Sequence, residues 1–96
     1  KPVIIDFYAD WCAACLELEE KVFSTPIFHE RAKNIVLLKM DATKPSEKLD
    51  SLKKQYGIVG LPTILFFDSN GEWIKTKTLT EYENKDSFLK RISDLK

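Results

Sequence analysis

Cysteine, glycine and histidine are scarce in this chain of 96 residues, which has two Cys, three Gly and one His. Two cysteines three positions apart allow one local bridge or a shared ligand, and they exclude a disulfide framework that ties distant segments together. Zinc needs about four ligands, and besides the cysteines only His29 and carboxylates could supply them. Because His29 falls on a separate predicted helical segment, we expect it to be a surface or packing residue, and we expect no metal site.

Long apolar runs and an excess of one charge are also absent. The longest nearly apolar run, Ile58 to Phe67, is interrupted by Gly60 and Pro62 and is too short to cross a bilayer. Fifteen basic residues balance fifteen acidic ones, so nothing favours nucleic acid or an anionic membrane as a partner. The chain opens on Lys1 without a signal peptide or an initiator Met. We therefore expect a single monomeric domain, residues 1–96, that is excised from a longer protein or processed.

The apolar residues, 44% of the chain, form a regular pattern of short segments. It predicts strands at residues 3–8, 35–40, 63–67 and 73–79, and helices from about residue 13, at about 25–33, around 49–56 and after Asn84. The first two strands read as buried, and Asn70-Gly71 favours a type I′ turn before the last strand. The order β-α-β-α-β-β-α predicts an α/β fold, a four-stranded mixed sheet with helices on both faces.

Cys12 and Cys15 lie where the first strand gives way to the first helix. The unpaired N–H groups and the dipole of a helix N-terminus stabilise an anion, so the pKa of Cys12 is expected to fall. Cys15 lies one turn inside the helix and is expected to be more buried. An exposed thiolate that attacks a disulfide and a second thiol that resolves the mixed disulfide are the elements of thiol-disulfide exchange.

Two carboxylates fall near this pair. Asp6 lies inside a predicted buried strand, where an unpaired carboxylate costs several kcal/mol, so its pKa is expected to rise. A purely structural Asp6, bonded to backbone groups, is the alternative. Glu19 lies four residues after Cys15 on the same helical face. It can tune Cys15, or it can be a solvated surface residue.

These residues carry a resemblance to a known family. The segment from Asp6 to Cys15, with Trp11 directly before the first cysteine, resembles the active site of the thioredoxin superfamily. Gly60-Leu61-Pro62-Thr63 resembles the cis-proline loop of that family, and the similarity spans nearly the whole chain. Two segments are similar to the C-terminal domain of the DsbD family of thiol:disulfide interchange proteins. One consists of residues 8–12 with Cys15, Glu17 and Glu19, and the other of residues 60–68.

The resemblance implies a thioredoxin-like fold and a thiol-disulfide oxidoreductase. It implies that Asp6 exchanges a proton with Cys15 and that Glu19 tunes Cys15. It also implies a cis bond before Pro62 that leaves the Leu61 backbone free to pair with an extended substrate. Trp11, and with it Tyr8, would pack around the same site, although Tyr8 is equally well explained as a core aromatic.

The resemblance also implies partners and a compartment. A DsbD-like domain has no cofactor beyond its redox-active disulfide. It accepts electrons from a membrane-embedded domain of the same protein and passes them to protein disulfides on the periplasmic side of a bacterial inner membrane. Two other functions remain open. One is a stand-alone thioredoxin-like reductase that serves cytochrome c maturation or general disulfide reduction, with a cytoplasmic location possible. The other is a binding module with redox-silent cysteines.

The chain departs from thioredoxin in three respects. Ala13-Ala14 stands where thioredoxin has Gly-Pro between its cysteines, so the reduction potential of thioredoxin cannot be assumed. The extra strand and helix with which thioredoxins begin are missing here. Thioredoxins often place a Lys near the buried Asp, whereas Lys39 is the only Lys on the second predicted strand and has no firm alignment. Glu19 would replace that Lys as the second tuning group.

Overall fold

Three strands and four α-helices, with two shorter helical turns, make up the chain in a computed structural model that describes residues 1–96. In chain order they are β1 (Val3–Tyr8), α1 (Ala13–Leu18), the π-helical turn η1 (Glu19–Phe23), α2 (Pro26–Arg31), β2 (Val36–Asp41), α3 (Glu47–Tyr56), β3 (Thr63–Phe67), the 3-10 turn η2 (Lys75–Lys77) and α4 (Lys85–Ile92). The bounds predicted for β1 and β3 are confirmed. None of the helices combines the length and the apolar character that crossing a bilayer requires.

β1 is the central strand of the sheet, whose order is β2-β1-β3. It runs parallel to β2 and antiparallel to β3, which confirms the parallel pair predicted from the first β-α-β unit. The register places Asp6 directly beside Lys39 of β2 and Ile64 of β3. The strand that Pro62 precedes therefore lies next to the strand that leads to the cysteines, as predicted.

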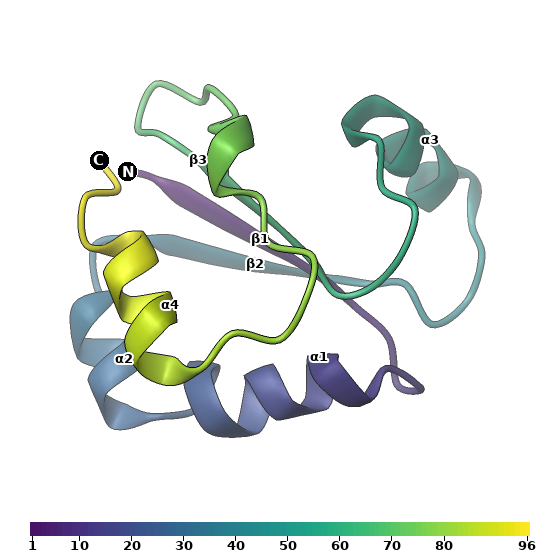
Figure 1. Ribbon diagram of the computed structural model, residues 1–96. Coiled ribbons are helices and arrows are strands. Elements are labelled where there is room, and N and C mark those ends of the chain that lie inside the picture. The colour runs from purple at the N-terminus through teal and green to yellow at the C-terminus, as the bar shows by residue number, and fades with distance from the viewer.

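Alternation of side chains along the strands creates two cores. Ile4 and Phe66 belong to a larger core of twelve buried residues, shared with α4 and the first helical segments. Phe7 and Leu65 belong to a smaller core of six, which includes Leu49 of α3. Figure 1 shows the corresponding layers, with α1, α2 and α4 on one side of the sheet and α3 on the other. Helices on both faces were predicted, and this arrangement is confirmed.

The ends of the helices follow local signals in the sequence. The Thr25 hydroxyl accepts a hydrogen bond from the Phe28 N–H at 3.3 Å, and Pro26 occupies the first position of α2. The Asn84 side chain caps α4 in the same way. Gly57 ends α3 with a φ of +65°, in the left-handed region that glycine adopts without steric cost. All three termini agree with the sequence prediction.

The first helix continues beyond α1 as the π-helical turn η1, which the sequence pattern did not predict. Its widened turn is marked by the hydrogen bond from the Ser24 N–H to the Glu19 carbonyl at 3.0 Å, which spans five residues. Val22 and Phe23 are both buried in the larger core. The extra residue in this turn therefore lets two consecutive apolar side chains face the sheet.

The predicted fourth strand, residues 73–79, is wrong as a continuous strand. Only two isolated bridges form, Ile64 with Leu79 and Phe67 with Trp73, and η2 lies between them. The physical reason lies in the side chains of η2. The Lys77 ammonium points away from the sheet and donates a hydrogen bond to the Arg91 carbonyl in α4. The backbone of η2 therefore turns toward this helix and does not continue along β3.

The turn before this segment also differs from the prediction. Gly71 has a φ of +83°, but no residue other than glycine has a positive φ, which excludes a type I′ turn at Asn70-Gly71. Instead the Asp68 carboxylate accepts hydrogen bonds from the N–H groups of Asn70 and Glu72 at 2.9 and 3.0 Å. These bonds favour a three-residue loop with a left-handed glycine at its end.

The prediction that β2 is a buried strand is also wrong. β2 is an edge strand because it pairs with β1 alone. Val36 and Leu38 are exposed, and the remaining β2 residues are exposed or only half-buried. An apolar sequence run therefore did not distinguish an edge strand from a central one.

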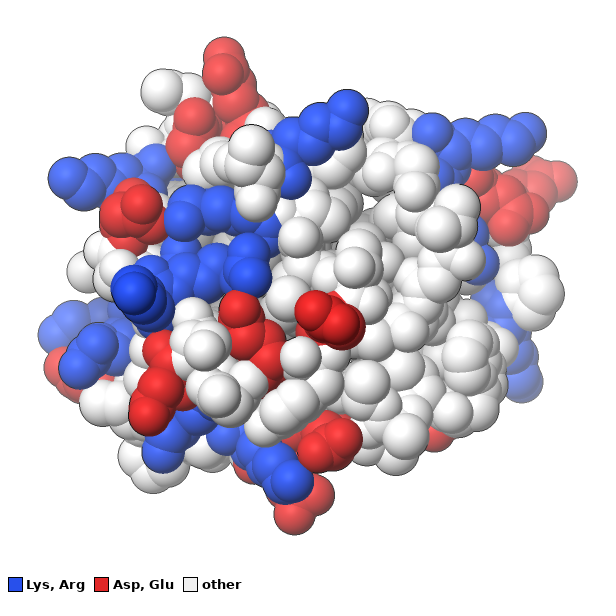
Figure 2. Space-filling view, viewed as in Figure 1, with Lys and Arg blue, Asp and Glu red and all other residues white.

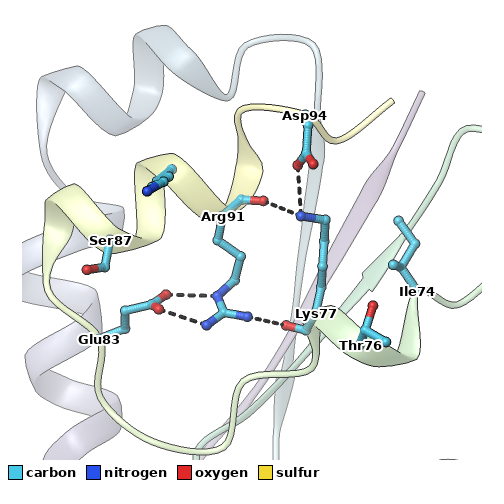
Figure 3. A pocket seen from close by; sticks show the side chains of 8 residues that line it. Ile74, Thr76, Lys77, Glu83, Ser87, Arg91 and Asp94 are labelled. Atoms are coloured by element: carbon cyan, nitrogen blue, oxygen red, sulfur yellow. Dashed lines mark hydrogen bonds and ion pairs between the residues drawn. The ribbon is translucent and has the colours of Figure 1, made fainter.

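A cluster of charged side chains fastens the segment that replaces the fourth strand onto α4. The Arg91 guanidinium donates to both carboxylate oxygens of Glu83, at 2.9 and 2.7 Å, and to the Lys77 carbonyl at 2.9 Å. The Lys77 ammonium in turn reaches Asp94 at 2.8 Å. Figure 3 shows these groups pointing toward one another. They line an open hollow of about 670 Å³. Arg91 and Glu83 are half-buried, and their paired hydrogen bonds hold η2 in place.

We expect the substitution Arg91→Ala to lower the free energy of unfolding by about 1.5–3 kcal/mol, the usual range for hydrogen bonds to charged groups. The variant leaves the half-buried Glu83 carboxylate without its partner. Urea denaturation measures the effect. Lys33→Ala is the matched control, because Lys33 forms an exposed pair with Glu30 and should change stability by less than about 0.5 kcal/mol. Equal effects in the two variants would contradict a fastening role for Arg91.

Candidate functional site

Cys12 and Cys15 form a disulfide at the N-terminus of α1, with their Cα atoms 5.2 Å apart. Cys12 is the residue before the helix, in an extended conformation, and its Sγ accepts a hydrogen bond from the Cys15 N–H at 3.2 Å. The helix thus begins with an N–H group aimed at the sulfur of Cys12. The same donor would stabilise a thiolate once the disulfide is reduced.

The predicted difference in burial between the two cysteines is absent in this disulfide form, because both are 6% exposed. They differ instead in what they face. Cys12 meets the open N-terminus of α1, whereas Cys15 lines a cavity of about 160 Å³ behind the disulfide. The two cysteines are therefore equally buried, and they differ because only Cys15 lines this cavity.

Asp6 occupies the inner part of this cavity. It is 5% exposed, and its Oδ1 has no hydrogen-bond partner. Burial raises the pKa of Asp6 to about 6, against a smaller lowering by the positive charge of Lys39. The alternative of an Asp6 satisfied by backbone hydrogen bonds does not agree with the unpartnered oxygen. A carboxyl group with a pKa in this range can accept a proton and release it near neutral pH.

The cavity brings together residues from three parts of the chain. Cys15, Leu16 and Glu19 come from the first helical segment, Asp6, Tyr8 and Asp10 from β1 and the residues just after it, and Lys39 from β2. The structure therefore places Asp6, Glu19 and Cys15 around one space, as the sequence analysis expected. Their chemical roles remain predictions.

Lys39 is the residue of this group whose place the sequence could not fix. Its ammonium forms an ion pair with Glu19, and its strand position lies directly beside Asp6. Asp6 and Lys39 occupy the same position, counted from the start, in β1 and β2. This pattern predicts that the two residues are neighbours only when the parallel register of the two strands is known.

The loop before β3 lies against the cysteines. The peptide bond between Leu61 and Pro62 is cis, as the resemblance implied. Leu61 packs against the small buried cluster that contains Cys12 and Cys15. The Thr63 hydroxyl donates to the Gly60 carbonyl at 2.7 Å and closes the turn. The loop thus presents its backbone beside the disulfide.

An exposed apolar surface surrounds these groups. Trp11 is 67% exposed directly before Cys12, and Leu16 and Val59 are also exposed. Figure 2 shows the surface over the start of α1 and the segment that leads into β3 as largely uncharged, while charges of both signs gather over α2 and α4. Val59 was not singled out from the sequence, since a single valine in a loop carries no pattern.

No cluster of three or more His, Cys, Asp or Glu residues is arranged to hold a metal ion. His29 lies in α2, where its ring contacts the edge of Phe28. His29 is exposed on the surface of α2 and does not line the cavity behind the cysteines.

The comparison with family models matches residues 1–94 to the thioredoxin model. Among curated proteins, the chain is 41% identical over 95 residues to the thiol:disulfide interchange protein DsbD of Yersinia enterocolitica, covering 99% of this chain and 16% of that protein. It is 40% identical over 92 residues to DsbD of Haemophilus influenzae, covering 96% of this chain and 16% of that protein. The chain thus spans about one sixth of the length of these relatives.

Solved structures give the same picture. The C-terminal domain of Neisseria meningitidis DsbD in its reduced form superimposes with a TM-score of 0.87 at 28% identity, over all of this chain and 82% of that one. Its oxidised form gives a TM-score of 0.83 at 28% identity, over all of this chain and 81% of that one. This chain thus resembles DsbD in sequence over nearly its whole length and in fold over all of it.

Proposed function

This chain belongs to the thioredoxin family, and we propose that it is a DsbD-like relay domain that reduces protein disulfides through Cys12 and Cys15. The observation that carries the proposal is the placement of the disulfide. One sulfur lies at a helix N-terminus, and the other lines the cavity that holds a buried carboxyl group. The two cysteines are thereby fitted for different steps of one exchange.

The reaction starts from the dithiol form. The Cys12 thiolate attacks one sulfur of a substrate disulfide, and the other substrate sulfur leaves as a thiolate that takes up a proton. Cys15 then gives its thiol proton to Asp6 and attacks the Cys12 sulfur. This step releases the second substrate thiol and forms the Cys12–Cys15 disulfide. Two electrons have passed from the domain to the substrate, and a donor dithiol restores the starting form.

The apolar surface and the loop before β3 supply the substrate contacts in this proposal. Leu61 packs beside the cysteines, so its backbone can pair with an extended segment of the substrate protein. Trp11 offers a large exposed aromatic surface directly before the attacking sulfur. Such contacts hold a disulfide in place without selecting a particular side-chain sequence.

The similarity to DsbD supports the partners that we propose. We place the electron donor in a membrane-embedded domain of the same protein, and the acceptors among protein disulfides on the periplasmic side of a bacterial inner membrane. Cytochrome c maturation would be one of the processes that use these electrons. The complete reading frame tests this part directly, since transmembrane helices encoded with this domain support the relay, and a lone signal peptide supports a stand-alone reductase.

The reduction potential tests the direction of electron flow. A protein reductant should equilibrate well below the potential of DsbA, which lies near −120 mV. Incubation with glutathione buffers of known ratio, followed by alkylation of free thiols, gives the value. A potential close to that of DsbA would exclude a reductant. Absence of any insulin reduction, together with a Cys12 pKa of about 8.5, would show redox-silent cysteines.

A further inference from the structure

The turn that leads into the disulfide lies against the loop that follows the neighbouring strand. β1 and β2 are parallel and their last paired residues are Tyr8 and Asp41, so the segments that follow them lie side by side (Figure 1). Residues 9–12 form a turn that is closed by the hydrogen bond from the Cys12 N–H to the Ala9 carbonyl at 3.1 Å. This turn therefore joins the end of β1 to the cysteine that we assign as the attacking one.

One hydrogen bond ties the turn to the loop after β2. The Asp10 N–H donates to the Thr43 Oγ1 at 3.0 Å, although the two residues are 33 positions apart in the sequence. No other hydrogen bond joins residues 9–11 to a distant part of the chain. Thr43 is therefore the polar anchor of this turn.

Asp41 orients the Thr43 hydroxyl for this contact. The hydroxyl and the N–H of Thr43 both donate to Asp41 Oδ1, at 2.5 and 2.9 Å. Because a hydroxyl has a single hydrogen to donate, its free lone pair is left to accept the Asp10 N–H. The Ala42 N–H donates to the Tyr8 carbonyl at 2.6 Å, and the Ala42 side chain is buried in the smaller core. The loop is thus fixed to the sheet on one side and to the turn on the other.

Trp11 depends on this turn for its position. Its side chain is 67% exposed and belongs to none of the buried clusters, so the backbone on either side sets its place relative to Cys12. Asp10 is the residue directly before Trp11, and its N–H is the group that Thr43 holds. A change at Thr43 is therefore transmitted to Trp11 through one residue of backbone.

We propose that Thr43 is a positioning residue that holds the turn carrying Trp11, and so sets how a substrate protein docks beside Cys12. The inference rests on the proposed function, in which Trp11 supplies a substrate contact. Thr43 acts through the Asp10 N–H and not through the reacting sulfur atoms. Its loss therefore weakens the docking of a protein substrate more than it slows the reaction of Cys12 with a small disulfide.

The substitution Thr43→Val removes the hydroxyl and keeps the branched shape of the side chain. It should raise the KM for insulin about fivefold, the factor that corresponds to one hydrogen bond of about 1 kcal/mol. It should leave kcat for insulin, and kcat/KM for oxidised glutathione, within about twofold of the unmodified values. Thr43→Ser keeps the hydroxyl and should restore the KM. In a Trp11→Ala background, Thr43→Val should have less than half of its effect, because Thr43 acts through Trp11.

Amide hydrogen exchange of Asp10, followed by NMR in the disulfide form, tests the hydrogen bond without requiring any activity. The Asp10 N–H should exchange about fivefold faster or more in Thr43→Val, whereas Thr43→Ser should keep its protection. Thr76→Val is the matched control, because it makes the same change at an exposed threonine of η2. It should alter neither the KM nor the exchange of Asp10. Urea denaturation checks that each variant folds, and Thr43→Ala takes the place of a valine variant that does not.

The outcomes separate this inference from the proposed function. If loss of the Thr43 hydroxyl leaves the KM for insulin unchanged, or lowers kcat/KM for insulin and for glutathione equally, the positioning role of Thr43 is wrong. An equal effect with and without Trp11 would contradict it as well. If the unmodified protein fails to exchange disulfides but the Asp10 N–H exchanges faster without the hydroxyl, the proposed function is wrong and the anchoring of the turn by Thr43 stands.

Discussion

The substitution Cys12→Ser should lower the rate of disulfide reduction by about a thousandfold or more, because it removes the sulfur that attacks the substrate. A hydroxyl is not ionised near neutral pH, and the hydrogen bond and the dipole at the start of α1 cannot make it a comparable nucleophile. The substitution Cys15→Ser should have a different effect. Attack by Cys12 would still occur, and the product should remain as a mixed disulfide with the substrate.

Insulin reduction and mass spectrometry distinguish the two variants. Cys12→Ser should give neither turnover nor an adduct, whereas Cys15→Ser should give one equivalent of covalent adduct that a small thiol releases. Urea denaturation of both variants in reducing buffer, beside the reduced unmodified protein, checks that they fold. An adduct that accumulates on Cys15 of the Cys12→Ser variant would reverse the assignment of attacking and resolving sulfur.

The substitution Asp6→Asn should raise the free energy of unfolding of the disulfide form by about 3 kcal/mol at pH 8. Below about pH 4 it should leave this free energy unchanged. Burial raises the pKa of Asp6 from 3.8 to about 6. Between these values the folded protein holds a proton that the unfolded chain has released, so the free energy of unfolding falls as the pH rises. A shift of about two units corresponds to about 3 kcal/mol, and asparagine removes this dependence.

Asp41→Asn provides a control of opposite sign. Hydrogen bonds from Thr43 lower the pKa of the exposed Asp41, so this carboxylate contributes stability that is present near neutral pH and lost as the pH falls. Denaturation curves at several pH values between 3 and 8 measure both variants. A stability gain for Asp6→Asn that is the same at every pH would show that burial of the charge is not its cause.

The kinetic effect of Asp6→Asn should oppose its effect on stability. Without the carboxyl group, Cys15 must lose its proton directly to water, and the resolving step should slow by about a hundredfold. Stopped-flow measurement of mixed-disulfide decay at pH 7 tests this expectation. Decay at the unmodified rate would leave Asp6 without a role in proton transfer.

Local patterns were sufficient for much of the fold. The strands around Asp6 and after Pro62 were predicted from runs of β-branched and aromatic residues, and the caps at Thr25, Asn84 and Gly57 were predicted from single residues. These features depend on neighbours within a few positions, which the sequence displays directly. The π turn after Leu18 was missed because it depends on which side chains the sheet accepts.

The errors in the strand predictions concern pairing at the edges of the sheet. Residues 73–79 have the composition of a strand, but the bonds of Lys77 to α4 turn the backbone away after one bridge. β2 is apolar enough for a central strand, yet it has no second neighbour. Whether a strand finds a partner depends on residues far away in the sequence, so composition could not decide either case.

The sequence by itself predicted the redox chemistry, because two cysteines three residues apart at a strand-to-helix junction place one sulfur at the helix N-terminus. It also located Asp6 and Glu19 as candidate partners. Only the tertiary structure decided that both carboxylates share one cavity with Cys15, and that Lys39 stands between them. The reason is that this site forms across two strands and a helix, and the parallel register of β1 and β2 alone sets Lys39 beside Asp6.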